Sequence, residues 1–175
     1  MSELIVALEN IRSLYNIGAI YRTCEFFGIK TIYLIGYSGI DEREPNKIHK
    51  KLQKTSLGTI DKIHTETFET TQDIFNKYKN IKLITIEQTK SSIPLSKLKL
   101  NTNKKGKILL LFGNEVNGVQ KETIEKSNQI VEIPRIGTHK SLNVTTSCGI
   151  ILSYLQLGTS TNPLNKSFPL ESNIS

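Results

Sequence analysis

Short apolar segments alternate with segments of helical periodicity along most of the chain. The apolar segments lack the polar alternation of a half-exposed strand, which indicates strands that are covered on both faces. We predict such strands at residues 4–8, 31–36, 81–86, 108–112 and 130–133, and a short strand within 62–68. This order is typical of an α/β fold in which a mostly parallel sheet carries helices on both faces.

The length and composition suit one compact domain without membrane or metal-binding segments. The 175 residues, of which 37% are hydrophobic, are enough to build a full core. We expect the domain to span residues 1–157, because Pro, Ser and Asn recur without periodicity over 158–175 and indicate a loose tail. No apolar run approaches the ~18 residues of a membrane span, so we expect a cytoplasmic protein. Cys24 and Cys148 lie in helical apolar patterns and the histidines are scattered, so we expect core thiols and no metal.

The positive charge favours a polyanionic partner. The formal charge is +7, although a coding sequence biased toward A·T pairs would produce the same balance. Four lysines after Pro45 have the spacing i, i+3, i+4 and i+7 and would form one basic stripe on a helix, and these are Lys47, Lys50, Lys51 and Lys54. Phosphate groups of an anionic partner would relieve the repulsion between them. A solvated surface helix accounts for the charges equally well.

A helix is predicted between Asn16, which can cap its start, and Gly28, which can end it in a left-handed conformation. Arg22 lies outside the apolar stripe of this helix and faces outward over Gly18. Because Gly18 has no side chain, this face of the helix would leave room for a ligand or a nucleic acid strand beside the guanidinium. The alternative is an ordinary surface arginine that pairs with Glu25.

Three predicted strands end in unusual polar segments. Glu87 and Gln88 follow the third strand, Gly113-Asn114-Glu115 follow the fourth, and a loop from Arg135 to Asn143 follows the fifth and leads into a helix capped near Ser141. The carboxyl ends of parallel strands share one edge of a sheet, so we expect a pocket there. Gly113 would let a ligand approach the backbone closely. Taken singly, each segment is equally typical of ordinary caps and turns.

Three motifs in the chain resemble the signature motifs of the SpoU (TrmH) family of RNA 2′-O-methyltransferases, within the SPOUT class. They are Asn16-x-Gly18-Ala19-x-x-Arg22, then Gly113-Asn114-Glu115-x-x-Gly118, then Ile133-Pro134-x-x-Gly137-x-x-x-Ser141-Leu142-Asn143. The order and the separations fit, and the resemblance covers residues 4–157. It implies the SPOUT fold with a deep trefoil knot in the C-terminal half, a homodimer, and S-adenosylmethionine as the methyl donor. Compact members of this kind often act on tRNA, so we expect tRNA more than rRNA.

The resemblance also assigns roles to individual positions. The donor-binding positions are Ile86, Glu87, Gly113, Asn114, Ile133 and Leu142. The positions for catalysis and substrate contact are Asn16, Arg22, Glu115, Ser141 and Asn143. Arg135 stands where the family often has an apolar residue, and we expect it to affect how donor or RNA is held.

The expected chemistry is attack of a ribose 2′-hydroxyl on a sulfonium methyl group, for which no metal is needed. Arg22 would act either as a base or as a phosphate clamp that stabilises the forming alkoxide, since an arginine pKa above about 12 makes deprotonation costly. Two other functions remain open. One is a non-catalytic RNA-binding module of the same fold. The other is a hydrolase that uses Ser141 and His139, although the sequence has no G-x-S-x-G elbow before Ser141 and no evident acidic partner.

Overall fold

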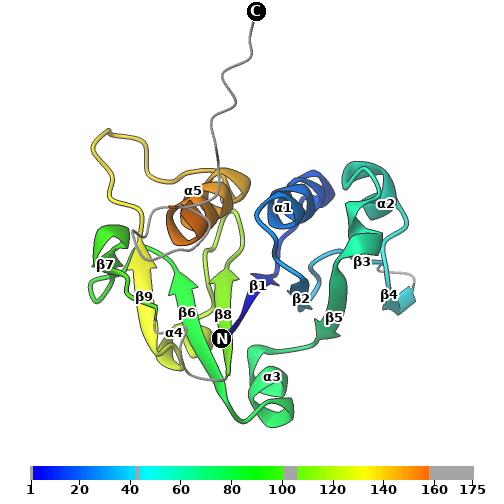
Figure 1. Cartoon of the computed structure of the whole chain (residues 1–175), viewed down its shortest axis with the longest axis horizontal. Coiled ribbons are helices and arrows are strands. Elements are labelled where there is room, and N and C mark those ends of the chain that lie inside the picture. Colours follow the sequence, from blue (N-terminus) through cyan, green and yellow to red (C-terminus); the bar gives the residue numbers. More distant parts are fainter. Residues whose placement is uncertain (1, 42–43, 101–105, 158–175) are drawn as a thin grey trace, which may run out of the picture.

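A computed structural model of the chain describes residues 2–41, 44–100 and 106–157. Seven strands form one sheet in the order β5-β2-β1-β8-β6-β9-β7 (Figure 1). Every neighbouring pair is parallel, and the strands are β1 (Glu3–Glu9), β2 (Thr31–Ile35), β5 (His64–Phe68), β6 (Ile81–Ile86), β7 (Ile93–Pro94), β8 (Lys107–Phe112) and β9 (Gln129–Glu132). The predicted parallel α/β fold is therefore confirmed. The trefoil knot stays a prediction, and the tail expected at 158–175 lies outside the described residues.

Helices cover both faces of the sheet. Three of them, α1 (Leu14–Phe26), α2 (Lys51–Thr55) and α5 (Val144–Leu157), pack on one face. On the other face lie α3 (Thr71–Lys77) and α4 (Lys121–Glu125). The chain also forms the short 3-10 helices η1 (Thr59–Lys62) and η2 (Leu95–Lys97) and a small antiparallel pair, β3 (Ile40–Asp41) with β4 (Glu44–Ile48). Within the described residues, none of the helices combines the length and the hydropathy that a bilayer crossing requires.

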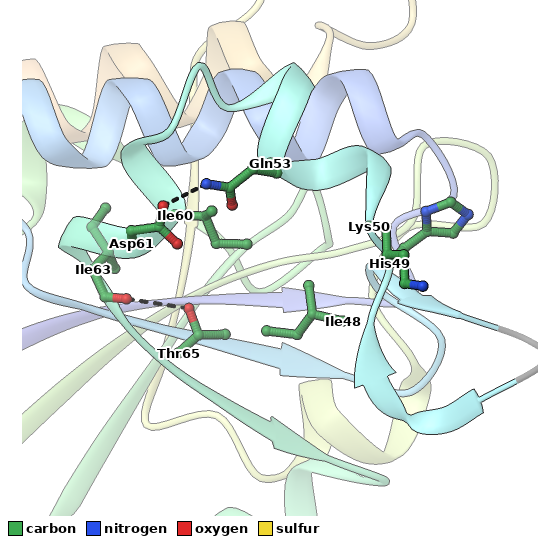
Figure 2. A pocket seen from close by; sticks show the side chains of 8 residues that line it. All are labelled: Ile48, His49, Lys50, Gln53, Ile60, Asp61, Ile63 and Thr65. Carbon is green, nitrogen blue, oxygen red and sulfur yellow. Dashed lines mark hydrogen bonds between the residues drawn. The ribbon is translucent and has the colours of Figure 1, made fainter.

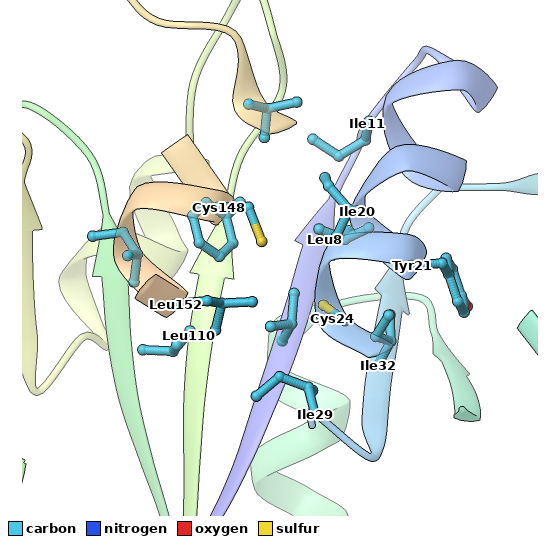
Figure 3. Close-up of a cluster of buried hydrophobic side chains, with 14 of the residues drawn as sticks. Leu8, Ile11, Ile20, Tyr21, Cys24, Ile29, Ile32, Leu110, Cys148 and Leu152 are labelled. Atoms are coloured by element: carbon cyan, nitrogen blue, oxygen red, sulfur yellow. The ribbon is translucent and has the colours of Figure 1, made fainter. Parts of the chain in front are cut away.

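The central strands are buried on both faces because consecutive residues in their middle are apolar. In β1, Val6 and Leu8 point into the core under α1 and α5, while Ile5 and Ala7 point into the core under α3 and α4. Burying a side chain of this size contributes about 1.5–3 kcal/mol. Figure 3 shows the larger cluster, in which Cys148 takes part from α5 together with residues of α1 and the strands. The ends of the central strands are therefore supported by packed cores on both faces of the sheet.

The first helix begins earlier than predicted. Its N-cap is Ser13, whose hydroxyl accepts a hydrogen bond of 3.2 Å from the N–H of Asn16, so Asn16 lies inside the first turn and does not cap the helix. The prediction for the other end is confirmed, because Gly28 has a φ of 75° and its N–H bonds the carbonyl of Glu25. The consequence for function is that the side chain of Asn16 is released for other contacts.

The predicted lysine stripe on one helix is wrong. Lys47 belongs to strand β4, and α2 begins only at Lys51, with Lys50 at its N-cap position. Lys50, Lys51 and Lys54 are exposed, and Leu52 faces the core as predicted. Residues Glu44–Ile48, which include Pro45, form the extended strand β4, so a helix that begins at Lys47 cannot form.

Candidate active site

The three polar strand ends lie side by side. Strand β6 pairs with β8 on one side and β9 on the other, so the segments after these strands share one edge of the sheet, as predicted. Strand β1 is the other neighbour of β8, which adds the loop before α1 to this edge. The carboxylate of Glu87 links two of the segments by accepting a hydrogen bond of 3.0 Å from the N–H of Val119.

Glu115 binds the start of α1. Its carboxylate accepts hydrogen bonds from the backbone N–H of Arg12 at 3.1 Å and of Ser13 at 3.2 Å, and from Nδ2 of Asn16 at 2.9 Å. Partial burial raises the pKa of Glu115, but these hydrogen bonds outweigh it and lower the pKa below its ordinary value. The lowered pKa makes Glu115 a weak base, and its three hydrogen bonds orient the start of α1 and the side chain of Asn16.

Asn143 joins the same network from the third motif. Its Nδ2 donates to Oδ1 of Asn16 at 3.3 Å, and its Oδ1 accepts the N–H of Thr145 at 2.8 Å. The second bond makes Asn143 the cap of α5, which begins at Val144, so the prediction that Ser141 caps this helix is wrong. We call Asn16, Glu115 and Asn143 the polar node. Its members come from three distant parts of the sequence, and the structure brings them together.

The turn after β8 is closed on itself. A Cβ atom at Gly113 would lie 2.5 Å from the carbonyl carbon of Gly118 and from the nitrogen of Val119. The glycine is therefore needed for the return of the chain itself. The approach of a ligand to its backbone stays a prediction. Asn114 holds the turn, because its Oδ1 accepts the N–H groups of Val116 and Asn117 at 2.9 Å each.

The loop between β9 and α5 offers both apolar and polar contacts. Ile133 and Ile86 are half-buried and pack against the same core cluster, and Leu142 is 52% exposed. Within the described residues, no N–H group from Arg135 to Leu142 has a hydrogen-bond acceptor. Exposed backbone donors beside half-buried apolar side chains suit a flat heteroaromatic ligand such as adenine. Glu87 and Asn114 have side chains already bound within the protein, so they could hold a ligand mainly through the backbone.

Arg22 lies apart from the polar node of its own chain. It follows Asn16 by six residues, which is about 9 Å along the helix and about 120° around it. The space over Gly18 is not open as predicted, because a Cβ atom there would lie 2.5 Å from Oγ1 of Thr55 in α2. The alternative pairing is wrong too, since Glu25 bonds Lys62 at 3.5 Å. Arg22 is exposed and forms no ion pair within the described part of the chain.

The contact between His139 and Ser141 does not resemble a catalytic pair. Nδ1 of His139 lies 3.2 Å from the backbone carbonyl oxygen of Ser141, so the imidazole is directed at the main chain and not at the hydroxyl. Both residues are exposed, as is Arg135, whose guanidinium approaches the carbonyl of His139 at 3.5 Å. This geometry argues against a serine hydrolase.

A shallow cavity of about 300 Å³ lies elsewhere, between β4, α2, η1 and β5 (Figure 2). Its lining residues are Ile48, His49, Lys50, Gln53, Ile60, Asp61, Ile63 and Thr65. None of them belongs to the polar node or to the three strand ends. Among the described residues, no group of three or more His, Cys, Asp or Glu side chains could hold a metal ion.

Three residues of this edge escaped the sequence reading. Arg12 and Ser13 donate their backbone N–H groups to Glu115, and Tyr37 accepts a hydrogen bond of 2.9 Å from Nδ2 of Asn114. Main-chain donors leave no side-chain pattern, so no sequence signal indicates the first two. The Gly-Tyr-Ser-Gly segment after β2 was a visible turn signal that could have drawn attention to Tyr37.

Comparison with known proteins agrees with this arrangement. An uncharacterized tRNA/rRNA methyltransferase of Borreliella burgdorferi is 30% identical over 148 residues, which is 85% of this chain and 61% of that protein. A tRNA (guanosine(18)-2′-O)-methyltransferase of Aquifex aeolicus is 28% identical over 152 residues, covering 86% of this chain and 67% of the relative. The chain thus spans about two thirds or less of the length of these relatives.

A solved structure and a family profile extend the match. The crystal structure of the A. aeolicus TrmH/SpoU tRNA modifying enzyme superimposes with a TM-score of 0.71 at 25% identity, over 87% of this chain and 73% of that one. The profile of the SpoU rRNA Methylase family matches residues 3–153, which include all three motifs and the whole sheet. The chain belongs to the SpoU rRNA methylase family.

Proposed function

We propose that the protein methylates a ribose 2′-hydroxyl of RNA with S-adenosylmethionine as donor. We favour a tRNA over an rRNA as the substrate. The observation that carries the proposal is the polar node, in which Asn16, Glu115 and Asn143 are hydrogen-bonded to one another at the shared strand ends. The names of the relatives support it, since the A. aeolicus protein is a tRNA 2′-O-methyltransferase.

The donor would lie at the ends of β6, β8 and β9. Ile86, Ile133 and Leu142 supply apolar surface, and the N–H groups of the loop before α5 supply donors for a purine. The segments at Glu87, Gly113 and Asn114 would form the remaining wall through their backbone. When bound, S-adenosylmethionine supplies a methyl group on a positively charged sulfur, which an oxygen nucleophile can attack in line.

The residues of the chain would fix the ribose and balance its charge. Asn16 is held from both sides, by Glu115 and Asn143, so its amide is oriented before any substrate arrives. Ser141 is exposed beside this network and can donate a hydrogen bond to the substrate. Arg22 would bind an RNA phosphate and stabilise the negative charge that forms on the ribose oxygen.

Arg22 needs a second copy of the chain for this role. It lies about 9 Å along α1 from Asn16 and faces a different side of the helix. We therefore propose a homodimer in which Arg22 of one copy reaches the polar node of the other. The chemistry uses protein groups and the donor alone, without a metal, and we place the protein in the cytoplasm, where its RNA substrates are.

A methyl transfer assay on the wild-type protein tests the proposal. Donor labelled in the methyl group is incubated with a pool of unmodified tRNA transcripts, and resistance to alkaline hydrolysis locates 2′-O-methyl groups. We expect label in alkali-resistant dinucleotides, and loss of this label with Asn16→Ala at saturating donor. Label in alkali-sensitive nucleotides would reject the 2′-hydroxyl as the acceptor.

The same assay separates the enzyme from a non-catalytic RNA-binding module of this fold. A module would bind tRNA without transferring label and would not bind the donor in equilibrium dialysis. We expect saturable donor binding and turnover. The contact of His139 with the carbonyl of Ser141 already disfavours a hydrolase.

A further inference from the structure

The loops after β1 and β2 lie next to the polar node on the same edge of the sheet. Strand β1 pairs with β8 on one side and β2 on the other, so residues 10–13 and 36–39 continue the row of loops beyond the proposed donor site. Two side chains on these loops are exposed, Arg12 and Tyr37, and the ring of Tyr37 belongs to a residue that is 51% exposed. The node does not use either side chain.

The two loops are locked together. The buried hydroxyl of Ser38 accepts the N–H of Ile11 at 2.8 Å and donates to the carbonyl of Leu8 at 2.7 Å. Asn10 is in the left-handed region with a φ of 55°, and Gly36, at a φ of 64°, lies so close that a Cβ atom there would collide with Oδ1 of Asn10. The backbone that carries Arg12 and Tyr37 is therefore fixed before a ligand binds.

Tyr37 is held by its hydroxyl and leaves much of its ring in solvent. The Nδ2 atom of Asn114 donates to this hydroxyl at 2.9 Å and to the carbonyl of Asn10 at 2.7 Å. Asn114 directly precedes Glu115 of the polar node, so the hydroxyl of Tyr37 is bonded to the residue next to the node. An exposed aromatic side chain that is ordered in advance is a favourable surface for stacking of an RNA base, because little side-chain entropy is lost.

Arg12 offers a cation on the neighbouring loop, since the N–H of Ile11 is bound by Ser38 of the loop that carries Tyr37. Its backbone N–H is bound by Glu115, whereas its guanidinium is exposed and has no ion pair within the described residues. The nearby carboxylate of Glu115 is occupied by the two backbone N–H groups and by Asn16. An exposed cation and an exposed aromatic ring on adjoining loops complement a nucleotide, whose phosphate can bind the cation and whose base can stack on the ring.

We propose that Tyr37 stacks on a base of the substrate RNA and that Arg12 binds a phosphate of the same strand. The edge of the sheet is then divided, with the ends of β6 and β9 holding the donor and the loops after β1 and β2 positioning the RNA. This assignment rests on the proposed function for the identity of the reaction. The binding of RNA at these two residues can be measured without turnover.

The test compares matched variants for affinity toward fluorescein-labelled unmodified tRNA in the presence of S-adenosylhomocysteine. Tyr37→Leu should weaken binding roughly 5- to 100-fold, the range of one lost base stack, and raise KM for tRNA by the same factor while kcat stays within about threefold. Tyr37→Phe keeps the ring and should retain most of the affinity. Phe26→Leu removes an even more exposed aromatic residue, at the C-terminal end of α1, and should change nothing.

Arg12 is tested through the salt dependence of binding. Arg12→Gln should reduce the slope of log affinity against log salt by roughly 0.7–0.9, the value for one phosphate contact. The control is Lys30→Gln, an exposed cation before β2 at the opposite end of the sheet, and we expect an unchanged slope. Donor affinity, measured by equilibrium dialysis, should equal that of the wild type in all variants.

The results separate this inference from the proposed function. Wild-type affinity and slope in Tyr37→Leu and Arg12→Gln, with turnover intact, would overturn the inference alone. Binding that weakens as described in a protein without methyl transfer would overturn the proposed function and leave the RNA contacts standing. Equal losses in Tyr37→Leu and Tyr37→Phe would also overturn the stacking role, since the ring remains in the second variant.

Discussion

Carboxylates at the two ends of the parallel sheet have different partners. Near the N-terminal end, Glu3 at the start of β1 bonds Lys107 at 2.6 Å, and Glu66 in the middle of the edge strand β5 bonds Lys77. Both lysines also lie over the ring of Tyr78, so the two ion pairs form one group around this ring. At the C-terminal end, Glu115 is bound by backbone N–H groups and Asn16, and Glu87 is bound by the N–H groups of Val119 and Gln88. No lysine or arginine takes part in the second set among the described residues.

This difference leaves cations at the C-terminal end unpaired. A carboxylate that is stabilised by main-chain donors and amides needs no positive side chain, so Arg12 and Arg135 stay exposed without ion pairs in the part of the chain that the structure describes. In the group around Tyr78 the charges cancel within the fold. We therefore expect substitutions at the C-terminal end to affect methyl transfer, and substitutions in the group around Tyr78 to affect stability alone.

The largest effect is expected for Arg22→Ala. Loss of a group that stabilises charge in the transition state typically costs 10²- to 10³-fold, so we expect kcat to fall by about that factor while donor affinity stays nearly constant. Arg22→Lys should recover part of the activity, because it keeps the charge but not the planar fork. Lost donor affinity with normal turnover at saturation would contradict the role given to Arg22.

Glu115→Gln should reduce both activity and stability. An amide cannot accept all three hydrogen bonds that the carboxylate accepts, and a hydrogen bond to a charged group contributes about 1.5–3 kcal/mol. We expect a fall of about 1–3 kcal/mol in the free energy of unfolding in urea and a loss of roughly tenfold or more in kcat. Full activity in this variant would show that the orientation of Asn16 is not needed for turnover.

Acid should unfold the protein partly through the same carboxylate. Burial raises the pKa of Glu115, but its hydrogen bonds lower it overall, so its contribution to stability is complete above the unfolded value of ~4.3 and is lost as the pH falls through the lower folded value. The free energy of unfolding, measured by urea titration between about pH 3 and 6, should fall less steeply for Glu115→Gln than for the wild type. Parallel curves would mean that Glu115 is not stabilised in the fold.

The smallest effect is expected in the group around Tyr78, in the middle of β5. Glu66→Gln removes a partly exposed ion pair with Lys77, for which about 1 kcal/mol or less is typical. The melting temperature should drop slightly, and kcat and KM for tRNA should equal the wild-type values. A loss of activity as large as that of Glu115→Gln would erase the contrast between the two sets of carboxylates.

The sequence predicted the sheet and the row of strand ends, because apolar runs such as 108–112 leave few alternatives to buried parallel strands. Helix starts were less predictable. Ser13 and Asn16 are both good caps, and the choice between them depends on Glu115, about a hundred residues away. The same limit applies to Gly113, since a sequence does not reveal whether a glycine makes room for a ligand or for its own chain.

The position of Arg22 shows a second limit. The helical pattern placed it correctly on the Gly18 side of α1, but the packing of Thr55 against Gly18 depends on α2, whose short length the lysine spacing concealed. The residues that join the three motifs could be named in advance only through the family resemblance. The hydrogen bonds between them required the fold.

Hydrogen exchange with S-adenosylhomocysteine bound tests the central claim most directly, because it locates the donor without requiring an active substrate. We predict slower amide exchange in residues 86–88, 113–118 and 133–143, at the three adjacent strand ends, and no change in residues 48–65, which line the cavity in Figure 2. Protection confined to residues 48–65 would contradict the assignment of the strand ends as the methyl transfer site.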